Sequence, residues 1–467
     1  MHDEREVAQM LSRKNDMDMT CGPFFKKLLV FSIPLVLSGV LQLLYNAADL
    51  IVVGQYAGQT AVAAVGSTGS LTNLIINVFF GLSVGVSVTV AISLGAHDSE
   101  NTNKLVHTAV TTSLIGGVIL AIVGFFCSRT FLIWMDTPDD VIDQASIYLQ
   151  IYFLGMPANL FYNYGSAIMR TTGDTSRPLY ILAASGLVNV ILNILLVKYT
   201  PLDVEGVAIA TVVSQILSAV AILYCLIKYN NDCKLYLSKL RIHKAQFLRI
   251  LRIGIPAGIQ GSIFSLSNVI IQSSVNSFGS AVMAGNSAAS NLEGFVYTGM
   301  NSFYQASVTF TGQNVGAKKL NNIKPIWLYN IAMVMGIWAI LSGGIYLFRY
   351  PLLALYLPDA PESVSYGILR MQIIFLTYFL CGLMEVTVGS TRGMGASLAP
   401  MLMSIIGVCG SRILWIFTVF KFVHTLEMLY ISYPVSWLVT FLAQVVGMII
   451  VKRRLVKHIY LDSVTKK

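Results

Sequence analysis

The sequence predicts an all-α integral membrane protein with twelve transmembrane helices, arranged as two six-helix lobes related by an internal repeat. Three observations predict this fold: the composition, the length of the apolar runs, and the repeat itself. Hydrophobic residues make up 55% of the 467-residue chain and charged residues only 11%, against roughly 25% charged residues in a soluble domain. Because unpaired backbone amides are costly in hydrocarbon, only helices or closed barrels cross a bilayer.

Twelve apolar runs divide the chain. Each is about 20 residues or longer, whereas strands of a membrane barrel need only about 9–11 residues, so all twelve are predicted as helices. The first six lie near residues 27–54, 62–94, 105–128, 141–169, 179–198 and 206–227. The second six lie near residues 247–277, 281–312, 326–348, 364–390, 399–420 and 429–451.

The second set of runs repeats the first. Short motifs recur after 221 or 222 residues: Ile33-Pro34 as Ile255-Pro256, Leu94-Gly95-Ala96 as Val315-Gly316-Ala317, Phe153-Leu154 as Phe375-Leu376, and Arg170-x-x-Gly173 as Arg392-x-x-Gly395. Because each half has an even number of spans, both halves share one orientation. The pseudo-two-fold axis therefore runs along the membrane normal, as in several transporters.

The repeat also sets the expected domain limits. They are a cytoplasmic leader over 1–25, an N-lobe over 26–228, an inter-lobe linker over 229–246, a C-lobe over 247–453 and a cytoplasmic tail over 454–467. Such a duplicated bundle could also be a channel or a scaffold. Two lobes about a central axis nevertheless favour transport by alternating access.

The distribution of positive charge predicts the orientation. Of the 31 Lys and Arg residues, 25 lie on the side of the two termini and Arg412 lies inside a run. The other five lie on the opposite side: Arg129, Lys198, Arg349, Arg370 and Lys421. By the positive-inside rule, both termini are cytoplasmic in a multi-pass protein of the cell membrane. The formal charge of +9 is therefore expected to face anionic lipid, and no nucleic-acid partner is expected.

Enzyme and metal chemistry find no support in the sequence. None of the six cysteines forms a Cys-x-x-Cys pair or a Cys/His ligand spacing. There is no nucleophile–base constellation and no phosphate-binding loop. We therefore expect no catalytic activity, no metal and no cofactor beyond a coupling ion, in a protein that functions as a monomer.

Ionisable and amide side chains inside the predicted spans are the candidates for function, because polar groups are costly in the membrane. Asp49 lies in the first run, Glu293 in the eighth, Glu385 in the tenth and Arg412 in the eleventh. The amides that accompany Asp49 are Gln42, Asn46, Asn189 and Asn193.

Helical spacing groups several of these candidates. Gln42, Asn46 and Asp49 follow one another at intervals of four and three residues, and Asn189 and Asn193 at four, so each set lies on one helical face. Burial makes the charged form of a carboxyl group costly, so such an acid can exchange protons near neutral pH. With amide oxygens it could instead hold Na⁺.

Arg412 needs a partner, because an unpaired guanidinium at mid-membrane is costly. We expect it to pair with Glu293 or Glu385, in which case that acid is structural. Otherwise the two acids contribute to coupling or to the binding of substrate.

The sequence also resembles a known family, the multidrug and toxic compound extrusion (MATE) transporters, and in particular their prokaryotic branch. The resemblance rests on Lys26-Lys27-Leu28-Leu29-Val30-Phe31-Ser32-Ile33-Pro34, on Gln42 to Asp49, and on Met169-Arg170-Thr171-Thr172-Gly173-Asp174-Thr175 with Pro178. It covers nearly the whole chain. It implies an antiporter that exports hydrophobic, often cationic compounds in exchange for H⁺ or Na⁺.

The same resemblance implies roles for particular residues. Asp49 matches the family's first-span acid, which takes part in cation coupling, and Asn189 matches an asparagine near it. Asn193 stands where many prokaryotic members carry a second Asp, so a proton site with two acids in the N-lobe is in doubt. The alternative function is that of a related flippase for lipids or lipid-linked oligosaccharides, although such flippases usually have fourteen spans.

Overall fold

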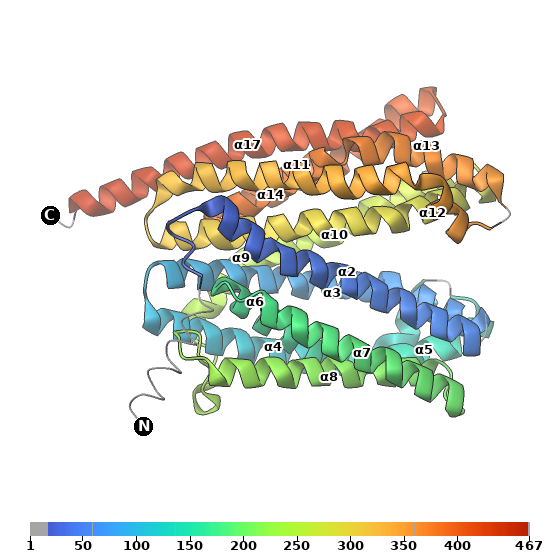
Figure 1. The fold of residues 1–467 in the computed structure, drawn as a ribbon, viewed down its shortest axis with the longest axis horizontal. Coiled ribbons are helices and arrows are strands. Elements are labelled where there is room, and N and C mark those ends of the chain that lie inside the picture. The colour runs from blue at the N-terminus through green and yellow to red at the C-terminus, as the bar shows by residue number, and fades with distance from the viewer. Residues whose placement is uncertain (1–16, 58, 136, 359, 466–467) are drawn as a thin grey trace. The chain divides into compact units, whose positions relative to one another are not determined.

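The computed structural model describes residues 17–465 except positions 58, 136 and 359; most of the predicted leader lies outside this range. Helices are the only regular elements in that part of the chain, and one or more helices cover every one of the twelve predicted runs (Figure 1). Contacts divide the described residues into two compact units: unit 1 comprises residues 17–18 and 37–255, and unit 2 comprises residues 19–36 and 256–465.

The bounds of the helices follow the predicted runs closely. Unit 1 contains α3 (Gln59–Gly95), α4 (Ser99–Trp134), α5 (Asp139–Leu154), α6 (Met156–Thr171), α7 (Ser176–Tyr199), α8 (Val204–Lys228) and η1 (Leu237–Lys239). Unit 2 contains α10 (Ser280–Gly316), η2 (Leu320–Asn322), α11 (Ile323–Leu347), α12 (Arg349–Tyr356), α13 (Pro361–Thr377), α14 (Phe379–Gly393), α15 (Leu398–Ser404), η3 (Ile405–Gly410), α16 (Ser411–Trp415), η4 (Ile416–Phe420) and α17 (Leu426–Thr465).

The remaining two helices are shared between the units. The division falls inside α2 (Phe24–Tyr56), between Val36 and Leu37, and inside α9 (Lys244–Asn276), between Ile255 and Pro256. Each of these helices contains one proline close to the division, Pro34 or Pro256. Proline removes a backbone hydrogen bond inside a helix and favours a bend. The expected lobe limits follow the sequence repeat, whereas the packing divides these first helices of each half.

Two pairs of helices form broken spans at repeat-related positions. In the described residues, nine helices are long and apolar enough to cross a membrane, and α13 with α14 makes a tenth span bent by 44°. The chain also breaks between α5 and α6, at Gly155. Together with α10, which is more polar, these elements account for twelve spans, and the all-helical prediction is confirmed.

Small residues let neighbouring helices approach closely within each unit. A Cβ atom on Gly117 of α4 would collide with the backbone of Pro157 in α6. In unit 2, a Cβ atom on Gly285 of α10 would collide with the backbone of Ser363 and Gly367 in α13. Glycine at such contacts allows the close backbone packing on which membrane helices depend.

Candidate functional site

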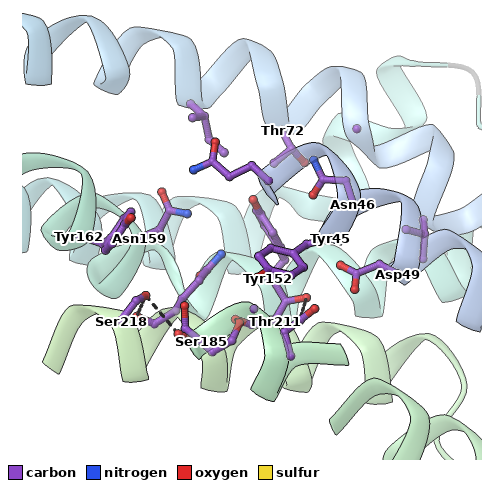
Figure 2. Close-up of a pocket in the computed structure, with 18 of the residues that line it drawn as sticks. Tyr45, Asn46, Asp49, Thr72, Tyr152, Asn159, Tyr162, Ser185, Thr211 and Ser218 are labelled. Carbon is purple, nitrogen blue, oxygen red and sulfur yellow. Dashed lines mark hydrogen bonds between the residues drawn. The ribbon is translucent and has the colours of Figure 1, made fainter. Parts of the chain in front are cut away.

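A cavity of about 560 Å³ lies within unit 1, between α2, α3, the α5–α6 pair, α7 and α8. The α2 helix contributes Gln42, Tyr45, Asn46 and Asp49, whose spacing of three and four residues places them on one face. Figure 2 shows Asp49 and Asn46 at one end of the cavity, Tyr45 and Tyr152 near its middle, and Asn159 and Tyr162 at the other end. The predicted face of the first span therefore lines a polar cavity.

Asp49 is held by a hydrogen bond from the Asn193 amide on α7. Asn193 is fully buried and also lies 3.4 Å, nitrogen to oxygen, from Asn189. Asn189 in turn donates to Thr211 of α8, at 3.4 Å. The structure thus joins Asp49, Asn193 and Asn189 in one hydrogen-bonded chain, with Gln42 and Asn46 on the wall of the same cavity.

Tyr45 sets the distance between α2 and α7. Its hydroxyl donates to the carbonyl oxygen of Ala183, at 3.1 Å. Its ring lies so close to Gly186 that a Cβ atom there would overlap it. This contact, one helical turn from Asp49, brings the carboxylate within reach of Asn193.

Sequence reasoning missed most of the remaining cavity wall. Asp49 is the only charged residue among the described residues that line it; the others are apolar, hydroxyl or amide groups. Tyr148 and Tyr152 stack with their ring centroids 6.0 Å apart, and Asn159 receives a hydrogen bond from Asn163. Both pairs have the i, i+4 spacing of a helical face, a signal available in the run 141–169.

In unit 2, Glu293 of α10 pairs with Arg370 of α13, at 2.5 Å between Oε2 and Nη2. Arg370 also donates to the side-chain oxygen of Asn286, at 2.8 Å. The charge count of the sequence had placed Arg370 on the outer face of the membrane, yet it is only 4% exposed. Its long side chain lies inside the helix bundle, where a carboxylate compensates its charge.

The expected pairing of Arg412 with Glu293 or Glu385 is wrong. Arg412 forms no ion pair within the described chain; its Nε donates to Ser436, at 3.0 Å, and its guanidinium lies 4.1 Å from the ring centroid of Tyr433. Arg370 from α13 takes the position beside Glu293, and an aromatic ring compensates Arg412 instead. Arg412 lies in α16, between the π-helical segments η3 and η4.

Glu385 lies apart from the Glu293–Arg370 pair along the chain, in α14, and is 7% exposed. Arg392, two turns further along α14, is buried as well and donates to the Tyr304 hydroxyl and to Gln260, at 2.6 and 2.8 Å. The structure therefore does not bring Glu293, Glu385 and Arg412 together in one ion-paired cluster.

Comparison with known proteins identifies the family. The MatE family model matches residues 34–195 and again residues 256–418, so that each half of the repeat matches by itself. The chain belongs to the MatE family. It is therefore a multi-pass membrane transporter and not an enzyme.

Relatives of this MatE chain match along nearly their whole length. "Probable multidrug resistance protein YoeA" of Bacillus subtilis is 29% identical over 90% of this chain and 92% of the relative. "Probable multidrug resistance protein NorM" of Thermotoga maritima is 24% identical over 85% of this chain and 86% of the relative. The solved structure of a MOP superfamily transporter from Pyrococcus furiosus superposes with a TM-score of 0.86 at 22% identity, over 94% and 97% of the two chains. This likeness supports the twelve-helix, two-lobed fold.

Proposed function

We propose that this MatE chain is a secondary active antiporter that exports hydrophobic, cationic small molecules or drugs by alternating access, in exchange for H⁺ or Na⁺. The single observation that carries the proposal is the cavity of unit 1, with one carboxylate in an otherwise uncharged wall. The names of the relatives from Bacillus subtilis and Thermotoga maritima, both multidrug resistance proteins, agree with it.

The wall of the cavity suits organic cations. Tyrosine rings from α2, α5 and α6 supply flat apolar surface with an electronegative face, which attracts a cation. Shape and apolar area give such a site broad selectivity. Asp49 adds one negative charge at one end of it.

Asp49 is the proposed coupling group. Its partner Asn193 is neutral, so no cationic side chain compensates the carboxylate in the described cavity wall. A proton can neutralise it directly. Alternatively, oxygen atoms of Asp49 and its neighbouring amides can hold Na⁺, since hard cations take oxygen ligands. Either event removes the negative charge that attracts a cationic substrate. Entry of H⁺ or Na⁺ would thereby be coupled to release of the substrate.

Transport into or out of proteoliposomes tests this proposal. A fluorescent organic cation is measured under an imposed pH gradient and, separately, under an imposed Na⁺ gradient, so that the two coupling ions are distinguished. Asp49→Asn keeps the shape of the side chain and removes its charge. We expect it to fold, and to lose gradient-driven transport by about 100-fold or more, since an essential proton-transfer group typically contributes 10²–10⁴-fold.

Asp143→Asn is the matched control, because Asp143 is an exposed acid on α5, paired with Arg129 and outside the cavity. It should transport at the rate of the unchanged protein. Gradient-driven transport by Asp49→Asn at that same rate would contradict the assignment of Asp49. Absence of transport of any cation by the unchanged protein, under either gradient, would contradict the export function itself.

A further inference from the structure

A second cavity, unrelated to the one that contains Asp49, lies in unit 1 where the start of α4 meets the linker between residues 229 and 243. Its volume is about 790 Å³. The α4 helix contributes its first two turns, and the linker folds over them through the short helix η1. On the proposed orientation this cavity opens to the cytoplasm.

Positive charge predominates in this cavity. Its basic residues are Lys104, Lys234, Lys239 and Arg241, and its acidic residues are Glu100 and Asp232. Lys104 pairs with Glu100, at 2.5 Å. The other three basic side chains form no ion pair within the described part of the chain. The cavity is therefore an electropositive pocket that has charge available for an anion.

Two of these cations are gathered around one ring. The ammonium nitrogen of Lys234 lies 5.5 Å from the ring centroid of Tyr236, and that of Lys239 lies 4.7 Å from it. Cation–π attraction holds both side chains near the same place. An anion that contacts both ammonium groups is stabilised by two positive charges.

Contacts with α4 hold the linker in position. His107 of α4 is 1% exposed, and its ring stacks on Tyr236 at an interplanar angle of 8°. The backbone N–H of Tyr236 donates to Nε2 of His107, at 3.0 Å, while Nδ1 lies 2.7 Å from the carbonyl oxygen of Asn103. Both ring nitrogens of His107 therefore have backbone partners. The cations are thus presented by an ordered backbone, which lowers the entropy cost of binding.

His243 at the end of the linker responds to the same charge. Burial first, and then the positive charges of Arg241 and Lys104, lower the pKa of His243. The two coulombic contributions agree with the predominance of basic side chains in the cavity.

We propose that this cavity is a binding site for a phosphate-bearing anion, supplied either by a lipid headgroup or by a soluble phosphate compound. Phosphate matches the site because its several oxygens can accept from Lys ammonium groups and from an Arg fork at once. A phosphate group carries about −1.5 to −2 charge at neutral pH, comparable to the excess of positive charge in the cavity. The site is independent of the proposed transport function.

Binding to the purified full-length protein tests this site. Sodium pyrophosphate is titrated by calorimetry in detergent, with sodium chloride of matched ionic strength as the blank. The double variant Lys234→Gln/Lys239→Gln should weaken binding about tenfold or more, because it removes two charge-assisted hydrogen bonds. The control Arg453→Gln/Lys457→Gln removes the same charge from exposed positions of α17 and should bind as the unchanged protein does.

A second arm distinguishes the source of the phosphate. Native mass spectrometry counts phosphatidic acid molecules retained by the protein from nanodiscs that contain phosphatidylcholine with or without phosphatidic acid. The site is assigned to a lipid headgroup if the unchanged protein retains phosphatidic acid, the variant Lys234→Gln/Lys239→Gln does not, and pyrophosphate does not bind. Binding of pyrophosphate to the unchanged protein assigns the site to soluble phosphate compounds. Binding of neither, or equal binding by both double variants at unchanged melting temperature, would overturn the proposal.

Discussion

At the scale of single residues, two acids inside the helix bundle have different surroundings. Asp49 receives its hydrogen bond from an amide, whereas Glu293 contacts a guanidinium and the two charges cancel. A carboxylate that is already paired gains little from a second cation, while one with a neutral partner is available to a proton or Na⁺. This difference is why we propose coupling at Asp49 and a structural role for Glu293.

The structural role of the Glu293–Arg370 pair gives a prediction about stability. The two side chains are only 12% and 5% exposed. Removing one partner of a buried pair leaves an uncompensated charge and typically costs 3–5 kcal/mol. Arg370→Gln should therefore lower the melting temperature and the folded yield sharply, and adding Glu293→Gln should restore part of the loss.

The exposed pair of Arg129 and Asp143 provides the control for that experiment. Its side chains are 57% and 73% exposed, and such pairs contribute only about 0–1 kcal/mol. Arg129→Gln should leave the melting temperature nearly unchanged. If Arg370→Gln and Arg129→Gln change the melting temperature equally, the buried pair stabilises the fold no more than the exposed pair does.

His243 gives a prediction about pH. Because its pKa is lowered in the folded protein, the folded state binds fewer protons than the unfolded state around the ordinary value of 6.5. Stability is then present in full above that pH and falls as the pH falls toward the lowered pKa. His243→Gln should therefore reduce the drop in melting temperature between pH 7.5 and 5.5. An unchanged pH profile in the variant would contradict this.

At the scale of helices, close backbone approach decides which elements pack together. Gly285 of α10 faces the backbone of α13, and this contact helps to place Glu293 opposite Arg370. In unit 1, the contact between Tyr45 of α2 and Gly186 of α7 helps to place Asp49 opposite Asn193. In both units, a small residue near the polar pair brings its two helices close enough for the pair to form.

A larger side chain at one of these contacts should separate the helices. Gly285→Val places methyl groups against the backbone of Ser363, which cannot move aside as a side chain would. Overpacking of this kind typically costs 1–3 kcal/mol, so the melting temperature should fall. Gly336→Val on α11 is the matched control, because nothing lies within 4 Å of its added Cβ atom. Equal melting temperatures of the two variants would contradict the close packing.

At the scale of the whole molecule, the two halves of the repeat carry different chemistry on the same framework. In the repeat register, Thr72 corresponds to Glu293, Tyr148 to Arg370 and Asn163 to Glu385. The first members of these pairs line the cavity of unit 1, and the second members are ionisable side chains of unit 2 with little exposed surface. Duplication therefore preserved the helices while the polar positions diverged.

The orientation of the whole molecule gives a prediction about labelling. Because 25 of 31 Lys and Arg residues lie on one side, that side should be cytoplasmic. Cysteine is introduced singly at two exposed positions, Ser238 in the linker and Asp203 between α7 and α8, in a protein without its native cysteines. A membrane-impermeant thiol reagent added to intact cells should label position 203 and not position 238. Labelling of position 238 and not of position 203 would contradict the proposed orientation.

The sequence by itself determined the twelve helices, the repeat and the polar face around Asp49, because hydropathy and helical spacing are properties of neighbouring residues. It also indicated the amides Asn189 and Asn193, since polar groups inside apolar runs are conspicuous. Only the tertiary structure decided which groups meet. Arg370 looked like an interfacial charge and Arg412 like the partner of an acid, yet packing between α10 and α13 reversed those roles. Pairing depends on how helices far apart in the chain are rotated against each other, and no local pattern encodes that rotation.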